Sequence, residues 1–179
     1  MSATGREGLA RAAWEVVIGL EVHCQLRTWT KLFCGCRNEF GAPPNSRTCP
    51  VCTAQPGALP VLNREALGLA LRAAVALECD VAERCSFDRQ NYFYCDLPKG
   101  YQITQLAEPY CTGGGLSLAS GKRVRLTRIH MEEDAGKAIH DRGDATLVDL
   151  NRAGVPLIEA VTEADMSSAD EAHELLTAL

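Results

Sequence analysis

Alternating apolar and polar residues predict a β-strand near the start of the chain, from Val16 to Arg27. Its two faces follow from the alternation: the apolar one carries Ile18, Leu20, Val22, Cys24 and Leu26, and the polar one carries Gly19, Glu21, His23 and Gln25. Glu21 and His23 are therefore expected to be neighbours. An acid beside an imidazole suits a metal site or an acid–base pair, and an ordinary strand with a solvated face shows the same pattern.

Apolar residues at helical spacing predict two helices. The first runs from Asn63, a favourable N-cap, to Cys79, with an apolar face of Leu67, Ala70, Leu71, Ala74, Val75 and Leu77. Ser168 and Glu171 form a capping box that opens the second, whose apolar face comprises Ala172, Leu175, Leu176 and Leu179. Because this helix reaches the last residue without a stop signal, we expect the chain to be a piece of something longer.

The whole pattern indicates an α+β fold, with helices packed on an antiparallel or mixed sheet. A further strand is expected over Arg123 to His130, and the glycine run 113–115 predicts a hairpin connection before it. With 179 residues, 46% of them hydrophobic, we expect one domain over 14–179 and a flexible N-terminus over 1–13. The net charge of −5 argues against a broad surface for DNA or RNA, and no stretch approaches the roughly 20 apolar residues of a membrane span.

Four cysteines in two close pairs, Cys34 with Cys36 and Cys49 with Cys52, suit one tetrahedral metal ion. We therefore expect structural zinc in the loop 34–52. Buried or disulfide-bonded cysteines are the alternative. The odd number of cysteines, nine, and a start without an apolar signal segment favour a reducing cytoplasm over disulfides.

The densest polar run, from Arg128 to Lys137, includes His130, Glu132, Glu133 and Asp134. Three adjacent carboxylates repel one another unless a cation lies among them. Mg²⁺ is the cation that carboxylates and phosphates commonly share. An acidic, exposed loop at a strand end is the alternative interpretation.

Two further segments combine charged groups with aromatic or apolar residues. Phe87–Gln102 interleaves Arg89 and Lys99 with aromatic rings, which suits phosphates together with a base or the terminal adenosine of an RNA. Aromatic residues of a half-buried strand are the more common explanation. Asp149–Glu159 surrounds an apolar Val-Pro-Leu-Ile core with Asn151, Arg152 and Glu159.

In this order, the segments resemble the GatB family, one component of the aspartyl/glutamyl-tRNA(Asn/Gln) amidotransferase. Seven motifs over about residues 14–165 carry the resemblance: Val17–His23, Lys31–Cys34, Pro56–Asn63, Phe87–Tyr94, Pro98–Ile103, His130–Lys137 and Val148–Glu159. The four cysteines occur in some members of the family and are lost in others. Gln90 stands where relatives often have Lys, and Cys95 stands where they often have Pro. One positive charge expected near the phosphate pocket or the ammonia tunnel is therefore absent.

The resemblance implies a cradle-like α+β domain that amidates a misacylated tRNA. ATP phosphorylates the side-chain carboxylate of Glu-tRNA(Gln) or Asp-tRNA(Asn), and ammonia displaces the phosphate. The partner amidase releases that ammonia from glutamine, a small third protein completes the heterotrimer, and only the acceptor end of the tRNA visits the cradle. A bacterial-type cytoplasmic protein is implied, with an organellar origin left open.

The resemblance also assigns residues to the site. The catalytic residues, which hold Mg²⁺ directly or through water, are Glu21, His23, Glu132 and Glu133. The residues for ATP and substrate are Arg89, Lys99, Tyr101, Asn151 and Arg152. The opening of the ammonia tunnel is placed near Lys99 and Glu133.

The family protein is much longer, so its later cradle residues and its helical and tail domains are expected to be missing here. This chain alone should therefore be folded but inactive. One alternative is a zinc-stabilised RNA-binding or assembly module without catalysis, and another is a catalytically incompetent fragment of the enzyme. The run Glu-Glu-Asp disfavours the module, because RNA-binding surfaces avoid carboxylates beside their contacts.

Overall fold

The computed structural model describes residues 14–141 and 143–179, so the predicted flexible segment 1–13 lies outside the described residues. Over the described residues the protein is mostly β, with two helices. Every pairing among the described strands is antiparallel, which agrees with the antiparallel form of the predicted sheet. Within the described ranges, no helix combines the length and the apolar character needed to cross a membrane.

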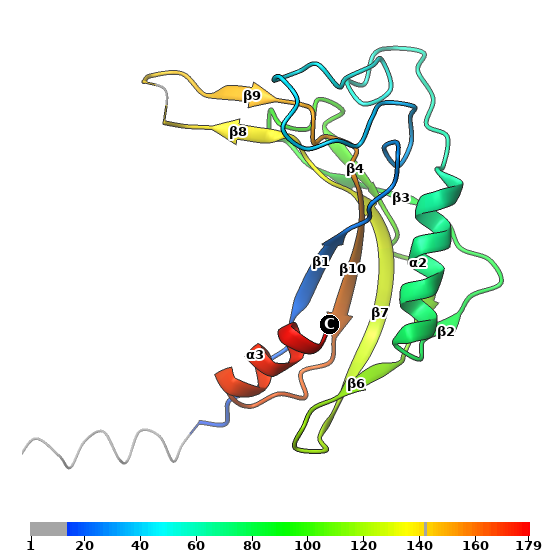
Figure 1. The fold of residues 1–179 in the computed structure, drawn as a ribbon, viewed down its shortest axis with the longest axis vertical. Helices are drawn as coiled ribbons and strands as arrows, with labels where there is room; N and C mark the ends of the chain where they lie inside the picture. The colour runs from blue at the N-terminus through cyan, green and yellow to red at the C-terminus, as the bar shows by residue number, and fades with distance from the viewer. Residues whose placement is uncertain (1–13, 142) are drawn as a thin grey trace, which may run out of the picture.

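Six strands form the main sheet, which runs through the middle of the molecule (Figure 1). Its order is β1 (Glu21–Gln25), β10 (Pro156–Thr162), β7 (Arg123–Glu133), β5 (Cys111–Thr112) and β2 (Asp80–Val81), and β6 (Gly115–Ser117) also pairs with β7. Strand β7 is central, because β10, β5 and β6 all pair with it.

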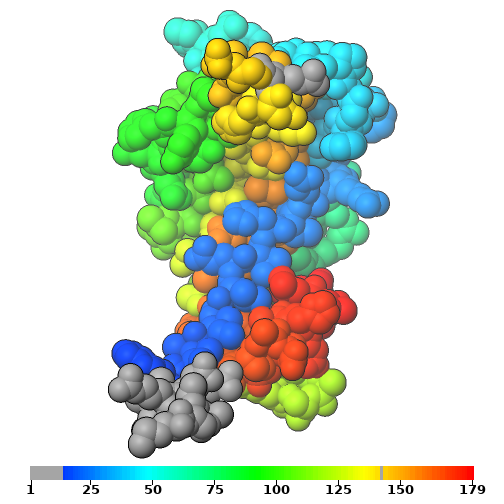
Figure 2. Space-filling model, turned by 90° about the vertical axis from the view of Figure 1, so that its left-hand side faces the viewer, coloured from blue at the N-terminus to red at the C-terminus, as the bar shows by residue number. Residues whose placement is uncertain are grey.

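Two smaller ribbons lie at one end of the sheet: β3 (Asp88–Asn91) with β4 (Tyr101–Thr104), and β8 (Lys137–Ile139) with β9 (Leu147–Asp149). In Figure 1, α2 (Arg64–Ala76) covers one side of the sheet, and the β8–β9 ribbon and α3 (Ala169–Ala178) project from the other. We call that other side the open face. Figure 2 looks onto it, with the segment around β1 (blue) running down its middle.

Helix α2 confirms the first predicted helix. The Asn63 side chain accepts hydrogen bonds from two N–H groups of the first turn, at 2.8 and 3.3 Å. The buried stripe is narrower than predicted, since it consists of Ala66, Ala70 and Ala74. Val75 is 70% exposed. Residues four apart lie on one face of a helix, so these small side chains let α2 approach the sheet closely.

The core between α2 and the sheet is built from one face of the central strands, represented by Ile129, Met131, Ile158 and Ala160. Buried Tyr110 joins this layer to the helix, because its hydroxyl donates to the carbonyl of Ala70 at 3.1 Å. The opposite face of the same strands is therefore free to carry polar chemistry.

The first predicted strand is shorter than expected, since β1 covers only Glu21–Gln25. Its alternation is nevertheless as predicted. His23 lies opposite Glu159 on the open face, and Cys24 lies opposite the core residue Ile158. Cys24 stays exposed because β1 is at the edge of the described sheet.

The glycine run 113–115 does not form the predicted hairpin connection. It links β5 to β6, which both pair with β7, and the hairpin turn before β7 lies instead between Leu118 and Lys122. Close packing explains the glycine: a Cβ at Gly114 would stand 2.4 Å from the carbonyl oxygen of Leu77, just after α2. Its φ of +85° also favours glycine.

Helix α3 confirms the second predicted helix. Ser168 Oγ accepts a hydrogen bond from the N–H of Glu171 at 3.2 Å, as the capping box predicts. Only part of the predicted apolar face is covered, since Leu176 and Leu179 remain exposed. Leu175 is fully buried in a second, small core with Leu118, Val124 and Met166.

Candidate functional site

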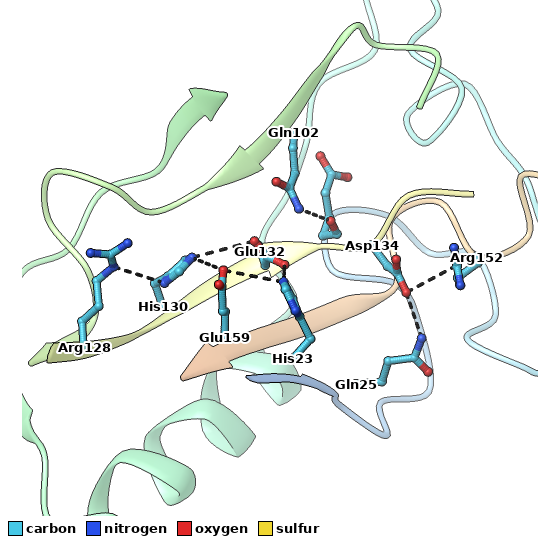
Figure 3. Close-up of polar contacts among 10 residues, drawn as sticks. His23, Gln25, Gln102, Arg128, His130, Glu132, Asp134, Arg152 and Glu159 are labelled. Carbon is cyan, nitrogen blue, oxygen red and sulfur yellow. Dashed lines mark hydrogen bonds and ion pairs between the residues drawn. The ribbon is translucent and has the colours of Figure 1, made fainter. Parts of the chain in front are cut away.

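Four ionisable side chains gather on the open face, where β1, β10 and β7 lie side by side (Figure 3). The antiparallel register places His23, Glu159 and His130 in one row across the three strands. Glu132 follows His130 by two positions on β7, so it projects from the same face. We call these four residues the open-face cluster.

Two contacts of hydrogen-bond length and two longer ion-pair contacts hold the cluster together. Nε2 of His23 lies 2.9 Å from Oε1 of Glu132 and 3.6 Å from Oε2 of Glu159. Nε2 of His130 lies 3.0 Å from Oε2 of Glu159 and 3.8 Å from Oε2 of Glu132. The two carboxylates therefore share both imidazoles. On its other side, His130 Nδ1 accepts a hydrogen bond from Nε of Arg128 at 3.4 Å.

Three members of the cluster are buried, and His23 is half exposed. The hydrogen bond from His130 lowers the pKa of Glu159. For His130 itself, burial lowers the pKa, but hydrogen bonds to Glu132 and Glu159 outweigh it and the pKa is raised. One ligand atom each from His23, Glu132 and Glu159 lie within 4.8 Å of one another, so these three residues can hold a divalent cation.

Two of the four predicted magnesium ligands lie outside the cluster. Glu21 is exposed on β1, opposite Val161. Glu133 projects from the α2 side of the sheet, because consecutive strand residues point to opposite faces. The structure thus brings His23 and Glu132 together and separates Glu133 from both.

On the α2 side, Glu133 forms a buried ion pair with Lys99. The N–H of Ile103 also donates to Oε1 of Glu133, at 3.0 Å. Burial raises the pKa of Glu133, and Lys99 works against that rise. A cavity of about 190 Å³ lies beside the pair and is also lined by Tyr101 and Cys52.

Arg89, Lys99 and Tyr101 lie together. The guanidinium carbon of Arg89 is 5.0 Å from the centre of the Tyr101 ring, and Nζ of Lys99 is 5.7 Å from it. Three of the predicted substrate-binding residues are thus beside the Lys99–Glu133 pair and not in the open-face cluster.

Asn151 and Arg152 use much of their hydrogen-bonding capacity within the fold. Arg152 Nη2 donates to the carbonyl of Gly136 at 2.7 Å. Asn151 Oδ1 accepts from the N–H of Arg47 at 2.7 Å, which fixes the loop 34–52. Both residues also line a cavity of about 420 Å³, together with Gln25, Asn38, Lys137 and Asp149.

The four cysteines of the predicted zinc loop form a second cluster, with their sulfur atoms within 4.8 Å of one another. Sγ of Cys49 and Sγ of Cys52 are 3.9 Å apart. A tetrahedral ion with zinc–sulfur bonds of about 2.3 Å requires sulfur atoms about 3.8 Å apart. The hydrogen bond with Cys34 lowers the pKa of Cys52 to about 5, so a thiolate forms readily. The residues fit a tetrahedral metal ion, and none of the nine cysteines, all described, is disulfide-bonded.

Glu159 and His130 are the cluster members that sequence reasoning did not assign as ligands. Glu159 follows an apolar run, so no polar alternation marks its face. It joins the cluster only through the register of β10 between β1 and β7. The available signal was a charged residue directly after the buried residues 156–158, because charged side chains in buried strands need partners.

The fold and the two clusters define a class of protein: an antiparallel sheet with a carboxylate–histidine site on its open face and a four-cysteine loop that fits a metal ion. The family described as GatB/GatE catalytic domain matches residues 16–179. The chain belongs to this family.

Curated relatives cover nearly the whole chain. A protein of Geotalea daltonii is 56% identical over 173 residues, which are 93% of this chain and 36% of that protein. The relative from Finegoldia magna is 54% identical over 92% of this chain and 36% of its own length, and that from Rhodopirellula baltica 53% over 91% and 34%. Each is named as the B subunit of aspartyl/glutamyl-tRNA(Asn/Gln) amidotransferase. This chain spans about a third of their length.

Proposed function

We propose that the chain carries the transamidation site of an aspartyl/glutamyl-tRNA amidotransferase. In this reaction, ATP phosphorylates the side-chain carboxylate of Glu-tRNA(Gln) or Asp-tRNA(Asn), and ammonia displaces the phosphate to leave the amide. The observation that supports the proposal is the open-face cluster, where His23, Glu132 and Glu159 converge from three strands. Family membership suggests the reaction, and the cluster is the proposed site at which it occurs.

Transfer of a phosphoryl group to a carboxylate depends on positive charge placed against phosphate oxygens. In our proposal His23, Glu132 and Glu159 hold Mg²⁺, which supplies that charge when bound. His130 orients Glu159 through their 3.0 Å contact. Glu21, on the same face of β1, contributes through water. Two carboxylates provide the hard oxygen ligands that Mg²⁺ prefers.

We place ATP or the acceptor end of the tRNA in the cavity of about 420 Å³. Gln25 lies in the same strand row as Glu132, so the cavity begins next to the open-face cluster. Lys137 and Arg152 contribute positive charge to its wall, and Asn151 supplies a polar rim. These groups suit the phosphates of a nucleotide.

On the α2 side, we assign the Lys99–Glu133 pair to the arrival of ammonia, with Arg89 and Tyr101 beside it. Glu132 and Glu133 are consecutive residues of β7, so the open-face cluster and the Lys99–Glu133 pair lie on opposite faces of the sheet at the same end of this strand. A partner amidase would release ammonia from glutamine, and a small third protein would complete the heterotrimer.

We further propose structural zinc on Cys34, Cys36, Cys49 and Cys52, and a cradle formed by the open face. The remaining length of the relatives would supply later cradle residues and the helical and tail domains that grip the tRNA. The net charge of −5 is compatible with this division, because only the acceptor end would reach the chain. The setting would be the cytoplasm of a bacterium.

The test is ATP-dependent conversion of Glu-tRNA(Gln) by the full-length protein with its partner proteins. Glu159→Gln removes one carboxylate and keeps the shape of the side chain, so the rate should fall at least about a hundredfold. Glu83→Gln, at an exposed position outside the cluster, is the control and should keep the wild-type rate. Thermal unfolding should show that both variants remain folded at the assay temperature. A Glu159→Gln enzyme with the wild-type rate would reject this site.

A further inference from the structure

Lys31 is a fully buried lysine, with 0% of its surface exposed. Its Nζ donates to the backbone carbonyls of Arg47 at 2.8 Å and Leu150 at 3.3 Å. Within residues 14–141 and 143–179, no carboxylate lies within 4.0 Å of it. Lysines are almost never fully buried unless paired, because an isolated ammonium loses its hydration. Among the described residues Lys31 therefore has no direct carboxylate partner, and its buried charge needs compensation from another group.

The thiolates of the four-cysteine cluster can supply the compensating negative charge. A Cβ built on Gly154 would stand 3.5 Å from Cδ of Lys31 and 3.7 Å from Cβ of Cys52, so both side chains lie beside Gly154. The electrostatics also place the charge of Lys31 within reach of Cys52. The hydrogen bond with Cys34 is the main cause of the lowered pKa of Cys52, and the positive charge of Lys31 acts in the same direction.

Two other cations of this region, Lys99 and Arg47, are already paired with carboxylates. Lys99 is bound to Glu133, and Arg47 lies 2.9 Å from Glu39. Four thiolates around one Zn²⁺ leave a net charge of −2, and burying that charge is costly unless a cation offsets it. Lys31 supplies one positive charge inside the protein, hydrogen-bonded to Leu150 of the β9–β10 turn.

We propose that Lys31 is the buried counter-charge of the four-cysteine metal site and fastens the loop 34–52 to the turn between β9 and β10. The inference rests on the proposed zinc site and adds a residue outside its ligands. Lys31 is a positioning residue, since it acts on the metal through the thiolates. Its two carbonyl partners explain the fastening: Arg47 belongs to the loop, and Leu150 to the turn.

The turn lies close to the residues proposed for the reaction. Leu150 is followed by Asn151 and Arg152, and the N–H of Leu32 donates to the carbonyl of Gly154 at 2.9 Å. A Cβ built on Gly154 would also stand 3.8 Å from Oε2 of Glu133. A zinc loop secured by Lys31 therefore also supports one wall of the Lys99–Glu133 cavity.

The experiment is a zinc-affinity measurement on the full-length protein, by competition with a chromogenic chelator. Lys31→Met keeps the length and packing of the stem and removes the charge. Lys31→Gln also removes the charge but keeps an N–H donor for the carbonyls. Outer groups around metal ligands typically change metal affinity about 10–100-fold, so both variants should bind zinc at least about tenfold more weakly. Lys122→Met, at a surface ion pair with Glu171, is the control and should bind as wild type does.

The outcomes separate the inference from the proposed function. If wild type takes up no zinc, the proposed metal site and this inference fall together. If wild type binds zinc and Lys31→Gln binds it within about threefold, the charge has no role and only the inference is overturned. Should Lys31→Met fail to fold, Lys31→Gln decides.

Discussion

Replacement of Lys99 by Met should destabilise the protein strongly, because it leaves the Glu133 carboxylate buried without its cation. The two side chains are 7% and 2% exposed, so water cannot take the place of the ammonium. Removing one partner of a buried ion pair typically costs about 3–5 kcal/mol. The N–H of Ile103 still donates to Glu133 at 3.0 Å. We therefore expect the lower end of the range, about 3 kcal/mol near neutral pH.

The loss should shrink on acidification. Burial raises the pKa of Glu133 even with Lys99 in place, and removal of the cation raises it further. A carboxyl group whose folded pKa lies above its unfolded pKa favours the folded state fully below the unfolded pKa, and this contribution is lost as the pH rises through the folded pKa. The difference in unfolding free energy between wild type and Lys99→Met should therefore narrow as the pH falls from neutral toward the unfolded pKa of glutamate, about 4.3.

The assay is urea unfolding followed by circular dichroism at several pH values. The double variant Lys99→Met with Glu133→Gln should recover much of the stability, because no unpaired charge remains. Lys122→Met breaks a more exposed pair with Glu171 and should cost at most about 1 kcal/mol. A Lys99→Met protein that loses less than about 1 kcal/mol at every pH would refute the burial argument.

Three further predictions concern the metal loop, the helix cap and the length of the chain. Cys49→Ser with Cys52→Ser should abolish binding of about one zinc per chain and lower stability by several kcal/mol, because metal binding at such sites is also folding free energy. Metal analysis and thermal unfolding check this, and a metal-free wild type of undiminished stability would contradict it. Asn63→Ala should cost about 1–2 kcal/mol in urea unfolding, since it removes the N-cap of α2, whereas Gln90→Ala at an exposed position should stay within about 0.5 kcal/mol. The 179-residue chain should make no Gln-tRNA(Gln) from Glu-tRNA(Gln) with ATP, Mg²⁺ and ammonium, and a protein of the relatives' full length with the partner amidase should. Conversion by the 179-residue chain near the full rate would show that the relatives' remaining length is not needed for the reaction.

Local signals in the sequence were enough for features set within a few residues. Asn63 and Ser168 marked the starts of α2 and α3 because capping is a contact between near neighbours. The alternation around His23 gave the correct face of β1 because the strand period is two. The paired spacing of the four cysteines likewise indicated a cluster that the structure brings together.

Long-range pairing was the part that the sequence could not supply. Glu132 and Glu133 read as one acidic run, and only the strand geometry of β7 sends them to opposite faces. Glu159 enters the open-face cluster because β10 lies between β1 and β7, and no local pattern encodes that order. The prediction for the glycine run 113–115 was wrong for the same reason: Gly114 packs against the carbonyl of Leu77, which is far away in the sequence.

Mn²⁺ binding to the full-length protein, followed by electron paramagnetic resonance with Mg²⁺ as competitor, tests most directly whether His23, Glu132 and Glu159 hold one divalent cation. We predict one site in wild type from which Mg²⁺ displaces Mn²⁺, an affinity for Mn²⁺ lower by at least about tenfold in Glu159→Gln, and wild-type affinity in the control Glu83→Gln. Equal affinity in wild type and Glu159→Gln would contradict it.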